Sequence, residues 1–168
     1  TVAGAISIST ANPENEWAAS AMIGGGQFNG EHYELMLNAP LIEDRLALRI
    51  AATRQRQDGY VRNTLRGSNE KRVDKEGLRA KLLFTPTDRL SAVLTYYQGE
   101  SRDSGQGWEP FLLTGAAEFL HGRFDPTLET DFDYRSHADA PNQSRSDTEV
   151  VNLEVNWDVG EHTLTLIG

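Results

Sequence analysis

Apolar and polar residues alternate over much of the chain with a period of two residues, which is the period of a β-strand. The clearest case is the segment 78–97, in which two alternating runs flank a short polar stretch at 85–88. Pro86 fixes its own φ and biases Thr85 away from the helical region, so the chain is expected to reverse there. The segment is therefore predicted to form an antiparallel β-hairpin.

Other segments show the same alternation and are also predicted to be strands. The pair Asn29-Gly30 is a strong signal for a tight hairpin turn between two of them. Two polar segments, 57–75 and 99–147, lack clean alternation and are predicted to be long loops. The remaining predicted strands are 1–10, 17–28, 33–38, 46–53, 151–157 and 162–168.

The lengths of the connections indicate how these strands are arranged. Tight reversals at 39–44, 85–88 and 159–161 alternate with long polar connections. In an up-and-down meander, alternate turns lie at the same end of the sheet, so the short turns would share one end and the long loops the other. Outer-membrane barrels have this asymmetry, and strands of about ten residues can cross a bilayer when tilted. We predict an all-β fold, an antiparallel up-and-down meander that is part of a large transmembrane β-barrel.

The alternation assigns the side chains to two faces, one expected to contact lipid and the other to line a lumen. Aromatic residues fall near the strand ends on the apolar face, where a membrane-interface girdle would lie: Trp17, Tyr33, Phe84, Tyr96 and Trp157. The residues expected to face lipid include Leu48, Ile50, Leu82, Leu94 and Leu153. The residues expected to face the lumen are Arg49, Arg79, Lys81 and Glu154. A soluble antiparallel β-sandwich would expose the same polar residues to water. A binding or adhesion module with 99–147 as its recognition loop is therefore the alternative.

Composition narrows the function classes. The formal net charge of −9 argues against a nucleic-acid partner, because such proteins need a basic surface. The chain has no cysteine, which excludes disulfides and thiolate metal sites. Its histidines have unrelated spacings and no known catalytic motif occurs. We expect no enzymatic activity, catalytic residue, metal site or cofactor.

Segment 99–147 carries more aromatic rings than an exposed loop usually does. These rings either pack together within the loop or form a stacking surface for an aromatic or amphipathic ligand, and the sequence leaves both interpretations open. The candidate ligand-binding residues are Trp108, Phe111, His121 and Tyr134.

Several phrases of the sequence resemble the early barrel of the TonB-dependent outer-membrane receptors. They are Asn38-Ala39-Pro40-Leu41, Leu48-Arg49-Ile50-Ala51, Asp58-Gly59-Tyr60 with Asn63, and Phe84-Thr85-Pro86-Thr87-Asp88. Residues 4–10, followed by a proline-containing linker, are similar to the last strand of that family's N-terminal plug. The resemblance implies that residues 1–16 end a plug domain and its linker. It also implies that residues 17–168 form about the first seven strands of a barrel of about 22.

The same resemblance implies active uptake of a scarce solute across the outer membrane of a Gram-negative bacterium. In this family the solute is most often a ferric siderophore or another iron complex, with vitamin B12, haem, other metals and glycans as alternatives. The implied partners are the inner-membrane TonB energy-transducing complex, through a segment expected to precede Thr1, and the lipid and lipopolysaccharide of the outer membrane.

Overall fold

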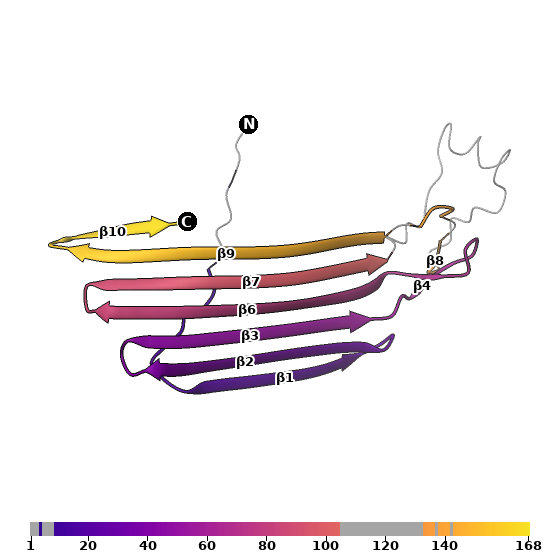
Figure 1. Ribbon diagram of the computed structural model, residues 1–168. Coiled ribbons are helices and arrows are strands. Elements are labelled where there is room, and N and C mark those ends of the chain that lie inside the picture. The colour runs from indigo at the N-terminus through magenta and orange to yellow at the C-terminus, as the bar shows by residue number, and fades with distance from the viewer. Residues whose placement is uncertain (1–3, 5–8, 105–132, 137, 142) are drawn as a thin grey trace.

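The computed structural model describes residues 4, 9–104, 133–136, 138–141 and 143–168. Its main feature is one antiparallel sheet of seven strands in the order β1-β2-β3-β6-β7-β9-β10 (Figure 1). The strands of this sheet are β1 Ala18–Gly26, β2 Gly30–Ile42, β3 Leu46–Gln57, β6 Arg72–Thr87, β7 Leu90–Ser104, β9 Gln143–Val159 and β10 His162–Ile167. The predicted all-β class and the up-and-down order of the strands are confirmed. The described strands form an open sheet with β1 and β10 at its edges.

The predicted hairpin at 78–97 is present as β6 and β7, with Leu82 opposite Leu94. The register shifts between Phe84 and Thr87, so Pro86 lies in an irregular part of the ladder and the turn follows it at 88–89. Proline has no amide hydrogen to donate to a ladder, and a bulge is one of the places where a strand accepts it. The turn therefore lies at the end of the predicted stretch.

The turn between β1 and β2 lies one residue earlier than the Asn29-Gly30 signal suggests. Gly30 N donates to Gln27 O at 3.1 Å, and the two residues between them, Phe28 and Asn29, have φ of 58° and 53°. Positive φ at both central positions is the geometry of a type I′ turn. Gly30 is needed for a different reason: a Cβ there would lie 3.0 Å from Gln27 O, which is tighter than side chains normally allow.

Three strands, β6, β7 and β9, extend well into the predicted loops, so the prediction of loops throughout 57–75 and 99–147 is wrong at the ends of these segments. β6 begins at Arg72, β7 continues to Ser104, and β9 begins at Gln143. The ladder between β7 and β9 is paired up to Ser104 opposite Gln143. Alternation is weak in these stretches because both faces carry polar side chains, but the backbone hydrogen bonds of a sheet do not depend on that pattern.

Inside the predicted loops the structure contains a second, small sheet of three strands in the order β5-β4-β8. Its strands are β4 Val61–Asn63, β5 Asn69–Glu70 and β8 Arg135–Ser136. β4 and β8 are parallel although they are far apart in the sequence. Strands of this length are too short to show a period, so the sequence did not predict them.

The two ends of the main sheet differ as expected from the connection lengths. The short turns after β2, β6 and β9 lie at one end, and the connections that contain β4, β5 and β8 lie at the other (Figure 1). We call these the turn end and the loop end. The predicted strand at 1–10 lies mostly outside the described residues, and Ser9 and Thr10 belong to no strand.

The described part of the chain has almost no hydrophobic core. Its buried apolar residues are only Pro13, Ala39, Ala47, Val61 and Val93, whereas many large apolar side chains are exposed. Domains normally bury the apolar face of a sheet against a second layer. The main sheet is a single layer, and its two faces carry different kinds of side chain.

Candidate functional site

One face of the main sheet is covered by aliphatic side chains in cross-strand rows. Leu82, Leu94 and Leu153 lie directly opposite one another on β6, β7 and β9. Leu48 continues this row on β3, and Ile50 belongs to the next row. The structure thus places the five residues expected to contact lipid on one face, which we call the apolar face. Contact with lipid itself stays a prediction.

The apolar residues form a band of limited height. On β7 the band runs from Leu90 to Tyr96, and on β9 from Val151 to Trp157. At about 3.3 Å per residue, such a stretch is about 20 Å long. The predicted aromatic residues Phe84 and Trp157 lie toward the turn end of this face. Trp17 precedes the first residue of β1 at the same end and belongs to no strand. Tyr33 and Tyr96 lie toward the loop end.

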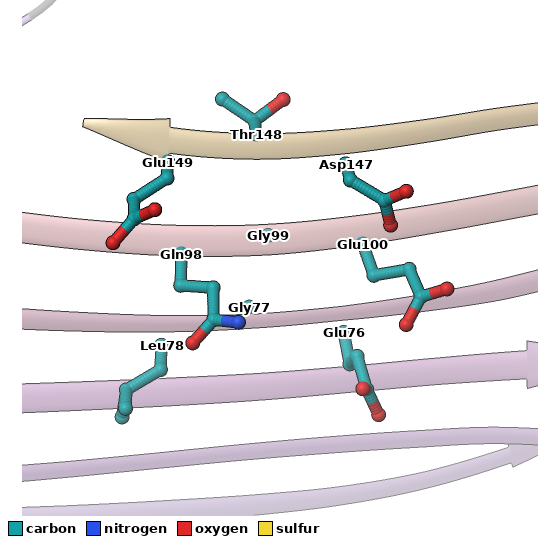
Figure 2. Close-up of a pocket in the computed structure, with 9 residues that line it drawn as sticks. All are labelled: Glu76, Gly77, Leu78, Gln98, Gly99, Glu100, Asp147, Thr148 and Glu149. Carbon is teal, nitrogen blue, oxygen red and sulfur yellow. The ribbon is translucent and has the colours of Figure 1, made fainter.

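Beyond Tyr96 the same face becomes strongly charged. Glu76, Glu100 and Asp147 lie directly opposite one another on β6, β7 and β9, as Figure 2 shows. With their neighbours Gln98 and Glu149 they surround a cavity of about 520 Å³ over the backbone of Gly77 and Gly99. The segment predicted to be a loop at 99–147 therefore begins as a paired ladder of charged residues.

Arginines from the next row bind these acids. Arg145 Nη2 lies 3.2 Å from Glu100 Oε1, and Arg145 Nε lies 3.0 Å from Asp147 Oδ2. Arg102 also pairs with Glu100. The hydrogen bond to Asp147, together with the charges of Asp147 and Glu100, raises the pKa of Arg145, which lies outside the apolar band. Two of the acids around the cavity, Glu100 and Asp147, are thus paired with arginines.

The opposite face, which we call the polar face, carries the four residues expected to line a lumen. Arg49 and Lys81 are directly opposite each other on β3 and β6, and Arg79 lies two residues from Lys81 on the same face. Glu154 lies on this face on β9, opposite Val93, and accepts a hydrogen bond from Asn156 Nδ2 at 2.9 Å. The structure brings the three cations together, but it does not bring Glu154 into an ion pair with them.

The N-terminal segment 9–16 lies on the polar face and is held there by Asn38. The side chain of Asn38 is fully buried. Its Nδ2 donates to Glu14 O at 2.8 Å and to Glu16 O at 2.6 Å, while its Oδ1 accepts from Glu14 N at 3.1 Å. One amide side chain therefore bonds the backbone of the segment in both directions.

Lys81 makes a second contact with the segment, nearer to the N-terminus. Its Nζ donates to Thr10 O at 2.8 Å and to Asn12 Oδ1 at 2.9 Å. Pro13, between the two contacts, is buried. In Figure 1 the N-terminal segment passes across the strands of the main sheet, as these contacts require. No local pattern in the sequence indicates that Asn38 binds this segment.

Tyr97 covers the glycines of the polar face near the loop end. A Cβ at Gly99 would overlap the Tyr97 hydroxyl, and one at Gly77 would lie 3.6 Å from Tyr97 Cε2. The Arg79 guanidinium carbon lies 5.0 Å from the centre of the Tyr97 ring, within cation-π distance. The Tyr97 ring occupies the space beside Gly77 and Gly99, where other residues would place a side chain, and it contacts Arg79.

A group of aromatic rings lies at the loop end. Phe28 and Tyr60 are stacked with their ring centres 5.1 Å apart, and Tyr134 meets Tyr60 edge-on at 6.0 Å. Tyr134 is one of the predicted ligand-binding residues. The other three predicted residues, Trp108, Phe111 and His121, lie outside the described residues. The sequence analysis missed Phe28 and Tyr60 as partners of Tyr134, because their proximity depends on contacts that are distant in the sequence.

Buried hydrogen bonds of the small sheet hold Tyr134 in place. The Glu70 carboxylate accepts from Asn63 Nδ2 and from Ser136 Oγ, each at 2.7 Å, and all three side chains are buried. The backbone bond from Arg62 N to Tyr134 O is 2.8 Å long. A satisfied buried polar network specifies one arrangement of the segments that it joins. The network therefore fixes the arrangement of β4, β5 and β8, and with it the backbone of Tyr134.

No cluster of His, Cys, Asp or Glu suited to a metal ion occurs among the residues that the structure describes. Within the same residues, no helix is long and apolar enough to span a membrane. Neither a family model nor a solved structure matches this chain.

Proposed function

We propose that this chain forms part of the barrel wall of an outer-membrane receptor that actively takes up a scarce solute. The observation that carries the proposal is the exposed apolar band on a single-layered sheet. Leu94 and Leu153 at its centre are 43% and 45% exposed, and Val151 is 65% exposed. Moving one such side chain out of water is favourable by about 1.5–3 kcal/mol. A wide band of them requires an apolar partner.

The form of the band supports lipid as that partner. Outer-membrane barrels carry an outward apolar band about 25 Å tall with aromatic residues at both edges. The band on this sheet is about 20 Å long along its strands, has aromatic residues toward both ends, and gives way to charged rows at the loop end. Packing against the second sheet of a soluble sandwich does not by itself explain why the strands change from an apolar band to charged rows.

The polar face supports a lumen that contains part of the same chain. Segment 9–16 is bound to this face by Asn38 and Lys81, as a linker between an internal plug and the first barrel strand would be. In this proposal residues 1–16 end the plug and residues 17–168 form the first strands of the barrel. The resemblance to TonB-dependent receptors supports coupling to the inner-membrane energy-transducing complex.

The loop end would face the outside of the cell and receive the solute. Phe28, Tyr60 and Tyr134 form a preorganised aromatic group there. Aromatic faces bind planar or amphipathic ligands by stacking. A ferric siderophore or another iron complex is the proposed solute, on the strength of the family resemblance.

Membrane insertion is tested by purifying the full-length protein with and without detergent. We expect folded, dispersed protein only when detergent or lipid is present. A folded monomer in plain buffer would contradict the proposal and favour the soluble binding module. Uptake is tested by deleting the gene and supplying single iron complexes: growth on one of them should fail. Uptake should also stop when the proton gradient is dissipated, and uptake that persists would contradict active transport.

A further inference from the structure

Three cationic side chains on the polar face surround a small cavity. Arg49, Arg79 and Lys81 line a space of about 180 Å³ together with Thr10, Ala11, Met36 and Ala51. Because Thr10 and Ala11 belong to the N-terminal segment, this cavity lies between the segment and the sheet. A water molecule takes about 30 Å³ in the liquid, so a small oxyanion fits.

The three positive charges around this cavity form no ion pair. Within the described residues, no carboxylate lies within ion-pair distance of any of the three. Glu34, on the same face, bonds to His32 instead. Glu154 bonds to the neutral Asn156 amide and its charge acts on Lys81 from beyond ion-pair distance, but one carboxylate against three cations leaves the cluster with excess positive charge. Glu14 and Glu16 of the N-terminal segment contact Asn38 through their backbones.

The excess positive charge is unfavourable as it stands. Arg49 and Lys81 face each other directly across the ladder, and like charges in that position destabilise a sheet. Lys81 is only 8% exposed, so water screens its charge poorly. Its two bonds, to Thr10 O and Asn12 Oδ1, are made with neutral acceptors and leave its charge in place.

The donors that remain suit an oxyanion. An ammonium has three N–H donors, of which Lys81 uses two. Arginine presents a planar fork of donors that binds carboxylate, phosphate or sulfate in pairs. In the described part of the chain, neither Arg49 nor Arg79 donates a side-chain hydrogen bond, and Arg79 is held against the Tyr97 ring.

We propose that Arg49, Arg79 and Lys81 form a binding site for an oxyanion, a carboxylate, phosphate or sulfate group, in the cavity beneath the N-terminal segment. The site needs only the polar face and segment 9–16. It therefore goes beyond the proposed transport function, and either proposal can fail without the other.

The site is tested by calorimetric titration of the full-length protein in detergent micelles with inorganic phosphate, sulfate and acetate. We expect saturable binding of at least one of them at millimolar concentrations. Preference for phosphate and sulfate would identify a tetrahedral dianion as the ligand, and equal or tighter binding of acetate would identify a carboxylate. Absence of saturable binding for all three would overturn the proposal.

Variants locate the binding. Arg49→Gln with Arg79→Gln should weaken binding at least tenfold, because each removes a charged donor pair. Lys75→Gln is the matched control, since Lys75 lies on the same face of β6 but opposite Gln55, outside the cavity. Equal losses in the control, or unchanged binding in the double variant, would contradict the site.

A stability measurement separates binding from a structural role. In anion-free buffer Arg49→Gln should unfold at the same temperature as the unmodified protein or higher, because it relieves repulsion. Added phosphate should then raise the unfolding temperature of the unmodified protein more than that of the variant. A variant that is less stable without anion would show that Arg49 supports the fold rather than a ligand.

Discussion

The two faces of the main sheet share one backbone ladder but meet different surroundings. On the polar face, Asn38 and Lys81 bind segment 9–16 through directional hydrogen bonds. On the apolar face, residues such as Leu153 remain exposed, and nothing in the described part of the chain covers them. The polar face therefore selects one particular partner, whereas the apolar face requires only an environment without water. Changes on the two faces should therefore have different effects.

The largest effect is expected when the apolar environment is withheld. The 168-residue chain, expressed alone in buffer without detergent, should aggregate, because its apolar band and both edge strands, β1 and β10, lack partners. Light scattering and size-exclusion chromatography measure this directly. A monomer with a cooperative unfolding transition in plain buffer would show that the two faces do not differ as proposed.

The second largest effect, on the free energy of unfolding in lipid, is expected from a charge placed on the apolar face. Leu153→Arg should reduce the free energy of unfolding in lipid by about 2–4 kcal/mol, the cost of arginine near the middle of a barrel wall. Its neighbour Asn152 lies on the polar face and gives the matched control, Asn152→Arg, which should cost far less. Equilibrium refolding into vesicles measures both. Equal losses, or a larger loss for Asn152→Arg, would reverse the assignment of the faces.

On the polar face, Asn38→Ala should lower stability by about 1–3 kcal/mol, since it leaves buried backbone groups of the segment without partners. The same change should raise hydrogen exchange selectively at residues 14–16. Asn152→Ala serves for comparison, because the Asn152 side chain makes a single exposed bond of 3.2 Å to Gly168 O. Unchanged exchange at 14–16 would mean that Asn38 does not hold the segment.

The smallest effect on the main sheet is expected from removing the connection between β7 and β9. Ser104 and Gln143 are paired partners, so residues 105–142 can be replaced by a short Asn-Gly turn without moving the strand ends. We expect the variant of the full-length protein to assemble normally in detergent but to lose ligand binding, because Tyr134 and the predicted residues Trp108, Phe111 and His121 are removed. Retained binding of the transported iron complex would place the ligand site elsewhere.

The sequence predicted the strands where the two faces meet different environments. Between Leu90 and Tyr96 every second residue must be apolar, and the alternation is plain. Past Tyr96 both faces carry polar side chains, so hydrophobicity no longer separates odd from even positions although the ladder continues to Ser104. The pattern therefore marks the apolar band rather than the full length of the strands.

The candidate site was predictable only in part, because its contacts join residues that are distant in the sequence. The alternation placed Arg49, Arg79 and Lys81 on one face, which the register confirms. Nothing local to Asn38 indicates that it binds the backbone of Glu14 and Glu16, more than twenty residues earlier. The neighbours of Tyr134 are likewise set by the pairing of β4 with β8, two strands too short to leave a pattern.

The continuous pairing of β7 with β9 also sets how far the wall would stand above a bilayer. From Tyr96 to Ser104 the ladder runs for eight further residues, or about 26 Å along the strand. At a tilt of about 40° this corresponds to a height of about 20 Å above the edge of the apolar band. In the proposed receptor, a molecule approaching the cell would then meet this extended part of the sheet, with its glutamates and arginines, among the sugars of the lipopolysaccharide before it reached the lipid.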